Sequence, residues 1–210
     1  MNIILDNIGR RYNNKWVFRS LNFSFLSDCK YAILGHNGSG KSTLIQIIAG
    51  NLSATEGKLV YTHKEKKIIA DEVYNYISFA APYMDLFEEM TLKEIIGFHF
   101  KFKKLINGIN ENEVMKQLKM EKDQNKLITN FSSGMKQRVK VALAVFSETP
   151  LLLLDEPCTN LDEDGIKWYK NLLDKYTENR TVFICSNNDK EWINFDGKVE
   201  LSDSIICKTT

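Results

Sequence analysis

The chain of 210 residues is long enough to bury a hydrophobic core of its own, and its 28 basic and 27 acidic residues leave a net charge of +1. This balance argues against a protein whose main task is to grip nucleic acid through its phosphates, so no nucleic acid partner is expected. Its four cysteines are scattered, without the spacing of a zinc site or a disulfide framework, which favours a reducing cytosol.

The sequence also predicts where the chain works. No apolar run approaches the roughly 18 residues that cross a bilayer, and the first residues lack the long apolar core of a signal peptide. We therefore expect a cytoplasmic protein. If it works at a membrane, it is peripheral, and another chain must span the bilayer.

Strands dominate the first part of the chain, with one helix among them. Alternating apolar positions and short apolar runs predict strands at residues 2–8, 20–26, 30–34, 57–62 and 76–80. A helical period runs from Ser42 to Ala49, and Gly50 ends it.

A helical insertion and a second set of strands follow. Residues 83–147 are rich in helix formers. The four leucines of residues 151–154 are typical of a strand buried on both faces in a parallel sheet. A helix from Asp164 to Tyr176, a strand at residues 181–186 and a short C-terminal tail complete the chain. The alternation predicts an α/β fold with a mainly parallel sheet.

A glycine-rich segment predicts a phosphate site. GHNGSGKS, residues 35–42, fits G-x-x-x-x-G-K-[ST] between a predicted strand and a predicted helix. The glycines let successive N–H groups point into one concavity, where the helix dipole adds positive charge. Lys41 can then reach the outer phosphates of a nucleotide, and the Ser42 hydroxyl can ligate Mg²⁺. A glycine-rich turn with an accidental lysine is the alternative, which the flanking strand and helix disfavour.

Two carboxylates follow the leucine strand, at the sheet edge where ligands bind in open α/β folds. Asp155 is placed to hold the shell of Mg²⁺ through water, and Glu156 to orient or deprotonate an attacking water. Alternatively, both residues only cap the turn before Pro157. The phosphate site favours the first interpretation.

These residues resemble the ATP-binding subunits of ATP-binding-cassette (ABC) transporters, and the similarity covers nearly the whole chain. GHNGSGKS looks like the family's Walker A loop and LLLLDE like its Walker B strand. The resemblance implies a P-loop NTPase fold of the ABC ATPase type, in which antiparallel N-terminal strands and a helical sub-domain flank the parallel sheet. It implies ATP and Mg²⁺ as ligands.

The resemblance also divides the chain. It implies a single nucleotide-binding domain, residues 1–210, with a RecA-like core of residues 1–82 and 148–210. The helical sub-domain is expected at residues 83–147.

A second segment implies a second cassette. FSSGMKQR, residues 131–138, looks like the family's LSGGQ-x-x-R signature, although Phe131, Ser133 and Met135 depart from it. Ser132 and Gly134 stand where the family contacts phosphate, at a helix N-terminus that can bind an anion; Ser132 can also be only a cap. In the family, two cassettes pair head to tail and close over ATP. The partner of this chain can be an identical or a different cassette.

Two further resemblances are less specific. TNLD, residues 159–162, matches the D-loop that crosses the interface between cassettes, but an ordinary helix cap at Asp162 explains it equally. Tyr12 matches the aromatic residue that stacks on adenine. Trp16 and Phe18 lie nearby, and any of the three can instead be a core residue.

The expected site residues fall into three groups. Catalytic roles are expected for Lys41, Glu156 and Asn187, and metal ligation for Ser42 and Asp155. The residues expected to contact the nucleotide are Tyr12, Gly35, Asn37, Gly38, Ser39, Gly40, Lys41, Ser42, Thr43, Ser132, Gly134 and Asp162.

Two positions depart from the family's catalytic pattern. Pro82 stands where a glutamine would contact the metal and the attacking water, and Asn187 where a histidine would hold the γ-phosphate. Asparagine can donate a hydrogen bond but cannot carry a positive charge or shuttle a proton. The chain is then either an ATP-gated switch with slow or no hydrolysis, or an active ATPase in which Asn187 donates in place of histidine. The presence of Glu156 favours the active ATPase.

The implied function is to hydrolyse ATP and so drive a polytopic membrane permease from the cytoplasmic face of the membrane. YMDLFEEM, residues 83–90, is expected to dock the permease; alternatively it is a solvated loop with Phe87 and Met90 turned into the core. A soluble cassette ATPase of translation or DNA repair usually has two cassettes or a coiled-coil insertion, which this chain lacks. A small-molecule kinase would leave the signature and D-loop without a purpose.

Overall fold

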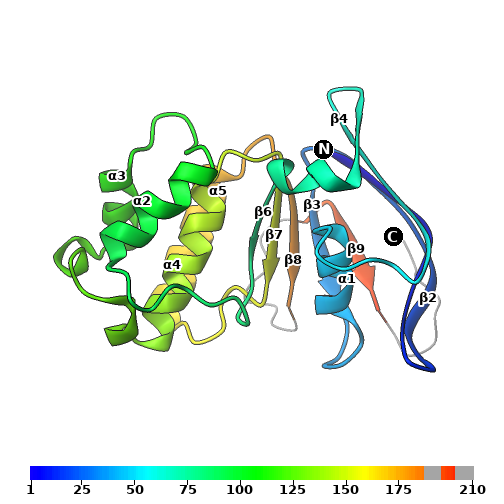
Figure 1. Cartoon of the computed structure of the whole chain (residues 1–210), viewed down its shortest axis with the longest axis horizontal. Coiled ribbons are helices and arrows are strands. Elements are labelled where there is room, and N and C mark those ends of the chain that lie inside the picture. The colour runs from blue at the N-terminus through cyan, green and yellow to red at the C-terminus, as the bar shows by residue number, and fades with distance from the viewer. Residues whose placement is uncertain (187–194, 202–210) are drawn as a thin grey trace.

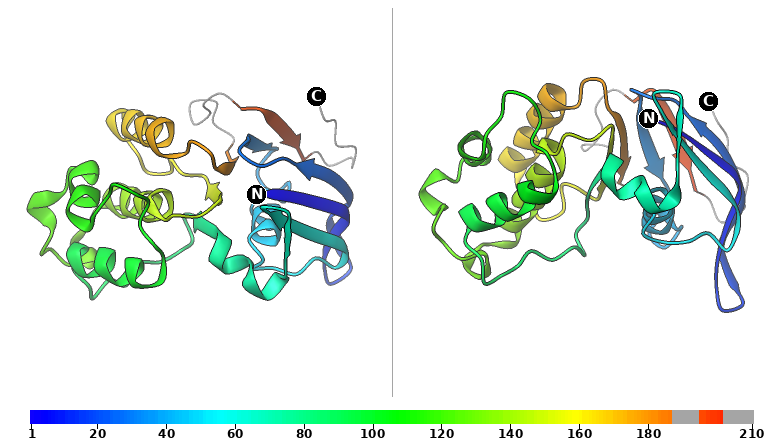
Figure 2. Two further views of the ribbon diagram at one scale, coloured as in Figure 1. Left: turned by 90° about the horizontal axis from the view of Figure 1, so that it is seen from above. Right: turned by 45° about the horizontal axis from the view of Figure 1, so that its top comes forward.

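Two sheets and a group of helices build the protein, whose computed structural model describes residues 1–186 and 195–201. The helices α2 to α5 lie on one side of the parallel sheet, and α1 lies on the other side, between the two sheets (Figure 1). Figure 2 shows the same layers from two further directions.

The antiparallel sheet has the strand order β2-β1-β4-β5. Its strands are β1 (Asn2–Tyr12), β2 (Lys15–Phe25), β4 (Glu56–His63) and β5 (Lys66–Ile68). The other sheet has the order β6-β7-β8-β3-β9, and all its neighbouring strands pair in parallel. Its strands are β6 (Ile77–Ala80), β7 (Leu151–Asp155), β8 (Thr181–Cys185), β3 (Lys30–Leu34) and β9 (Gly197–Glu200).

Five α-helices lie within the described residues. They are α1 (Lys41–Ile48), α2 (Leu92–Phe102), α3 (Glu111–Leu118), α4 (Ser133–Phe146) and α5 (Glu163–Tyr176). Short 3₁₀ turns occupy Ala70–Tyr76, Glu121–Asp123 and Ile128–Asn130. The predicted α/β fold, with its parallel core, antiparallel N-terminal strands and helical region, is confirmed.

Two strands differ from the prediction. β5 was not expected, and β9 lies where the sequence predicted a tail. β9 has only four residues, of which Val199 alone is buried, so its pattern is too short to show a period of two. It is a strand because β3 offers a free edge, on which Tyr31 pairs with Gly197 and Leu34 with Glu200.

The core lies on both faces of the parallel sheet. Leu151 and Leu153 pack into a cluster with α1 and the antiparallel sheet, whereas Leu152 and Leu154 pack into a cluster with α2 to α5. The helical region therefore shares its core with the sheet. The division of the chain at residues 83 and 147 stays a prediction.

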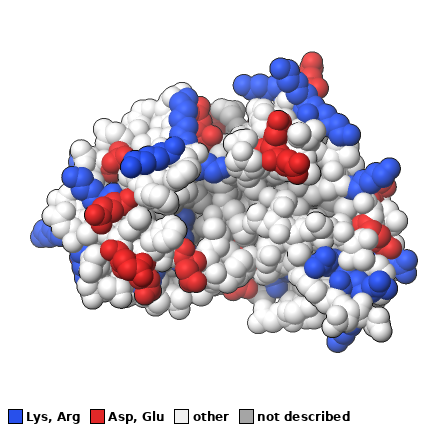
Figure 3. Space-filling view, viewed as in Figure 1, with Lys and Arg blue, Asp and Glu red and all other residues white. Residues whose placement is uncertain are grey.

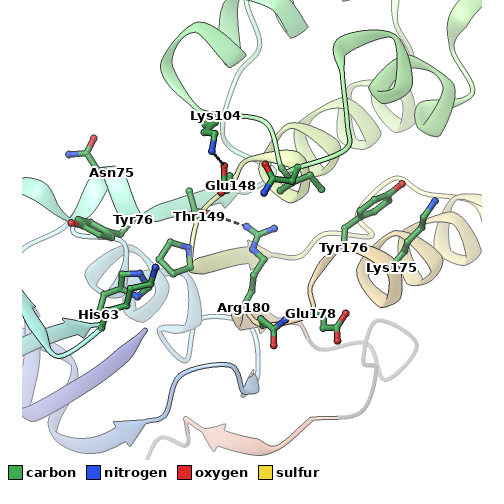
Figure 4. Close-up of a pocket in the computed structure, with 15 residues that line it drawn as sticks. His63, Asn75, Tyr76, Lys104, Glu148, Thr149, Lys175, Tyr176, Glu178 and Arg180 are labelled. Carbon is green, nitrogen blue, oxygen red and sulfur yellow. Dashed lines mark hydrogen bonds and ion pairs between the residues drawn. The ribbon is translucent and has the colours of Figure 1, made fainter.

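Arg180 connects the beginnings of three strands with the helical region. It is 6% exposed and borders a hollow of about 690 Å³ (Figure 4). Its Nη1 donates to the Val145 carbonyl at 2.6 Å, and its Nη2 donates to the hydroxyls of Ser78 and Thr149, each at 2.9 Å. No carboxylate of residues 1–186 and 195–201 forms an ion pair with it. Burial lowers the pKa of this guanidinium to about 10.

Arg180→Met should lower the free energy of unfolding by about 2–3 kcal/mol, because it leaves the buried Val145 carbonyl without a donor. Urea unfolding measures this change. Arg19→Met is the matched control, because the ion pair of Arg19 with Glu56 lies at the surface and should contribute little. Equal changes in the two variants would contradict the proposed role of Arg180.

Candidate functional site

A hollow of about 490 Å³ lies where β3 leads into α1. Among the described residues, those that line it are Val17, Asn37, Gly38, Gly40, Lys41, Ser42, Thr43 and Glu156. All but Val17 are residues that the sequence singled out. The fold therefore brings Glu156, from the end of β7, to the glycine-rich loop. Gly35 and Ser39 belong to this loop without lining the hollow.

The loop exposes backbone donors at the start of α1. Gly40 precedes this helix with φ of +98°, and a Cβ at this position would lie 2.6 Å from Val17 Cγ1, so only glycine fits. No side chain of the described residues caps α1, which leaves its first N–H groups available to an anion. Lys41 Nζ donates to the carbonyls of Gly35 at 2.7 Å and His36 at 3.1 Å. A third N–H of the ammonium is left for a phosphate.

Asp155 is a buried carboxylate, only 1% exposed. Burial raises its pKa, while the Ser42 and Tyr83 hydroxyls that face it lower the pKa. Neither hydroxyl forms a hydrogen bond of ordinary geometry with Asp155. Both carboxylate oxygens therefore have no hydrogen-bond partner among the described residues. Two unpaired buried oxygens beside a serine hydroxyl fit a hard cation such as Mg²⁺.

The described residues offer few further ligands to such a metal. No group of three His, Cys, Asp or Glu side chains within residues 1–186 and 195–201 could hold an ion. Mg²⁺ is commonly held by one or two protein ligands together with water and phosphate oxygens. Ser42 and Asp155 match this pattern.

Glu156 has an unusual backbone conformation. Its φ of +43° lies in the left-handed region, which costs a residue other than glycine on the order of 1 kcal/mol. Its N–H donates to the Cys185 carbonyl at 2.8 Å. The buried Gln137 amide donates to the carbonyls of Glu156 at 3.4 Å and Pro157 at 3.0 Å. These contacts hold the turn that directs Glu156 into the hollow. The sequence did not reveal Gln137; a polar residue on the apolar face of a helix was the available signal.

Comparison with known proteins agrees with this geometry. The family model described as "ABC transporter" matches residues 18–159. The chain belongs to the ABC transporter family. It is 26% identical to the uncharacterized ABC transporter ATP-binding protein YybJ of Bacillus subtilis, over 96% of each chain.

Other relatives are longer, and solved structures share the fold. The chain is 29% identical to the sulfate/thiosulfate import ATP-binding protein CysA of Mesostigma viride, of which it spans 59%. The ATP-binding cassette MJ0796, solved as a dimer in a post-hydrolysis state with ADP and Pi, superposes with a TM-score of 0.83 at 23% identity. That comparison covers 99% of this chain and 98% of the other.

The signature and D-loop segments of this ABC cassette lie beside each other. Ser132 caps α4 by accepting from the Met135 N–H at 3.2 Å, and Asp162 caps α5 by accepting from the Gly165 N–H at 2.7 Å. Within the single chain both side chains thus act as helix caps. A Cβ on Gly134 would lie 2.7 Å from the Asn160 carbonyl oxygen. None of Ser132, Gly134 and Asp162 lines the hollow at α1.

The three aromatic residues considered for stacking on adenine, Tyr12, Trp16 and Phe18, have different environments. Phe18 is a core residue, 3% exposed, whereas Tyr12 is 48% exposed. The Arg10 guanidinium lies 4.5 Å from the centre of the Tyr12 ring. The guanidinium groups of Arg11 and Arg19 lie 5.3 and 4.6 Å from the centre of the Trp16 ring. Tyr12 is not among the described residues that line the hollow, and its stacking on adenine stays a prediction.

Asn187 and Pro82 are the two positions that depart from the family's catalytic pattern. Asn187 lies outside the described residues. Pro82 lies two residues after the end of β6, and its carbonyl accepts from Lys140 Nζ at 2.7 Å. Within the described ranges, the cassette has no helix of sufficient length and hydrophobicity to span a bilayer.

Gly134→Ala should lower the melting temperature of the isolated chain, because the added methyl would press on the Asn160 carbonyl and cost about 1–3 kcal/mol. Gly97→Ala is the control. Gly97 lies inside α2, where a Cβ would meet nothing closer than 3.6 Å, and alanine should stabilise the helix. Thermal unfolding of the monomer checks both variants. An unchanged melting temperature for Gly134→Ala would show that the Asn160 carbonyl does not require a glycine here. Contact with the phosphate held by a partner cassette would then be the remaining reason for it.

Proposed function

We propose that this ABC cassette binds and hydrolyses ATP with Mg²⁺ and transmits the resulting movement to a separate membrane permease. The observation that carries the proposal is the convergence of Lys41, Ser42 and Glu156 on one hollow, beside a buried carboxylate with unpaired oxygens. This arrangement supports a phosphate-binding side at Lys41 and a water-activating side at Glu156.

Each residue has a distinct role in the proposal. Lys41 and the N–H groups at the start of α1 hold the outer phosphates. Ser42 and Asp155 hold Mg²⁺, which when bound neutralises charge on the phosphates. Glu156 accepts the proton of the attacking water. Among the described residues, the Glu156 side chain accepts one hydrogen bond, from the Thr159 hydroxyl, which is long at 3.5 Å, so its carboxylate stays available. Asn187 donates to the γ-phosphate.

A second cassette would complete the site. The hollow opens to solvent in the single chain, and water at the outer phosphate would weaken its electrostatic interactions. The start of α4, with Ser132 and Gly134, presents another set of N–H groups that could cover the phosphate of a second copy. MJ0796, which shares the fold, was solved as a dimer. We propose that this chain also pairs with a second cassette, in a head-to-tail arrangement with Asp162 at the interface.

The surface for the permease is proposed to be the loop between β6 and α2. Tyr83, Met84 and Phe87 are 50%, 39% and 57% exposed. Met84 and Phe87 line an apolar hollow of about 280 Å³, together with Phe98 and the exposed Phe102. Phe87 thus does not turn into the core, whereas Met90 packs against it. Charged side chains are sparse in the centre of the face shown in Figure 3. An apolar segment of a permease fits this surface and would hold the cassette on the cytoplasmic face.

Lys41→Ala should weaken ATP binding at least tenfold, because the phosphates lose a buried, charge-assisted donor. Isothermal titration with ATP measures the loss. Lys167→Ala is the control, since Lys167 is exposed on α5 and forms its ion pair with Asp164 at the surface. Wild-type affinity in Lys41→Ala would refute the phosphate-loop assignment.

Glu156→Gln should bind ATP normally and lose about 100-fold or more in turnover, because the amide cannot accept the proton of water. Phosphate release and light scattering, recorded over a range of protein concentrations, should show an ATP-bound dimer that accumulates. Glu121→Gln, at an exposed position, is the control. Turnover equal to wild type would exclude Glu156 as the base. ATP binding without turnover in the wild type would favour the ATP-gated switch.

A further inference from the structure

The tyrosine that follows Pro82 places its hydroxyl at the buried carboxylate of the nucleotide site. Gln46 Nε2 donates to Tyr83 Oη at 3.2 Å. The Tyr83 hydroxyl and the Asp155 carboxylate are close enough for each to affect the pKa of the other, although they form no hydrogen bond with each other in this structure. The Tyr83 ring is half exposed and meets Phe79 edge-on, with 6.4 Å between ring centres. The polar end of the side chain is thus directed inward, although its ring is not buried.

Gln46 ties this hydroxyl to the helix that begins at the phosphate loop. Ser42 and Gln46 are four residues apart in α1, and residues at this spacing share one face of a helix. The face that offers Ser42 to a metal therefore also holds Tyr83. Together with Asp155, these residues form one polar group around the proposed metal site.

The backbone before Tyr83 is held from the opposite side. The Met84 N–H donates to the Ala81 carbonyl at 3.2 Å, which closes a turn around Pro82 and Tyr83. Lys140 of α4 donates to the Pro82 carbonyl at 2.7 Å, and the proline ring fixes φ at its own position. Tyr83 is thus positioned by α1 through its hydroxyl and by α4 through its backbone.

The direction of the hydroxyl proton follows from these contacts. A tyrosine hydroxyl has a single proton to donate, and its oxygen can accept at the same time. Because the Gln46 amide occupies an acceptor position, the Tyr83 proton is free to point toward Asp155. Pro82 has no side-chain donor, and Ser42 is engaged by the metal in the nucleotide-bound state. Among the described residues, Tyr83 is therefore the donor that can orient the Asp155 carboxylate without binding the metal itself.

We propose that Tyr83, held by Gln46, is a positioning residue that orients Asp155 toward Mg²⁺ in the nucleotide-bound cassette. The inference rests on the proposed function, since it assigns a role within the same site. Donors behind a metal-binding carboxylate fix its orientation, and their removal typically costs about 10–100-fold in metal affinity.

The test uses Mn²⁺ as the probe, added with ATP to the chain of 210 residues. Binding is followed by the electron paramagnetic resonance signal of free Mn²⁺. Tyr83→Phe should weaken Mn²⁺ binding about tenfold, while its affinity for ATP without metal should equal that of the wild type. Tyr74→Phe is the matched control, because Tyr74 is an exposed tyrosine, 65% accessible, away from the lining of the hollow.

Gln46→Leu tests the supporting contact. It should weaken Mn²⁺ binding about threefold, the effect of one neutral hydrogen bond. If Gln46 acts through Tyr83, the double variant should bind Mn²⁺ no more weakly than Tyr83→Phe alone. A larger loss in the double variant would overturn this arrangement.

The outcomes separate the inference from the proposed function. Wild-type protein that binds no Mn²⁺ in the presence of ATP would refute the proposed function and the inference with it. Normal wild-type binding with unchanged binding in Tyr83→Phe would refute the inference alone. A Tyr83→Phe variant that loses metal-free ATP affinity to the same extent would show that Tyr83 shapes the nucleotide pocket and does not orient Asp155.

Discussion

Burial of β7 on both faces is the constraint on which the rest of this cassette depends. Its leucines alternate between the two hydrophobic clusters, and the neighbouring β8 does the same with Val182 and Ile184 on one face and Phe183 on the other. Each buried leucine contributes about 1.5–3 kcal/mol. The end of β7 is therefore held firmly against the start of α1, and any residue that follows the leucines is carried to the phosphate loop.

The positions of Asp155 and Glu156 lower the stability of the chain, and the proposed function gives a reason for them. Asp155 is drawn into the interior with both oxygens unpaired among the described residues, and Glu156 takes a left-handed backbone conformation. Both features lower stability; Glu156 lines the hollow, and Asp155 directly precedes Glu156 in the chain. Unpaired buried charge and local strain gather at sites where a ligand or a reaction uses them. A bound cation would satisfy Asp155, so the nucleotide-bound cassette should be the more stable state.

Helix α4 connects the separate parts of the site. Gly134 meets the carbonyl of Asn160, Gln137 donates to the Pro157 carbonyl, and Lys140 donates to the Pro82 carbonyl. These residues are spaced by three and lie along one side of the helix. One rigid element therefore touches the D-loop, the backbone after Glu156 and the segment before Tyr83. Gln137 and Lys140 thus make contacts within the chain, and Ser132 caps the N-terminus of the same helix.

The sequence by itself determined the α/β fold, the phosphate loop at residues 35–42 and the pair of carboxylates after the leucine strand. Each of these depends on a short local pattern, because glycine, a leucine run and a helix start dictate structure within a few residues. Whether Ser132 and Asp162 are caps remained open at that level, since a cap and an anion site use the same residue types at a helix start.

Only the tertiary structure decided the contacts that support the site. Gln46 and Tyr83 are 37 positions apart, Gln137 and Pro157 are 20 apart, and Arg180 and Ser78 are 102 apart. β9 likewise became a strand because the edge of β3 was free. No local pattern encodes such pairs, because a side chain's partner depends on which distant segments the burial of apolar surface brings together.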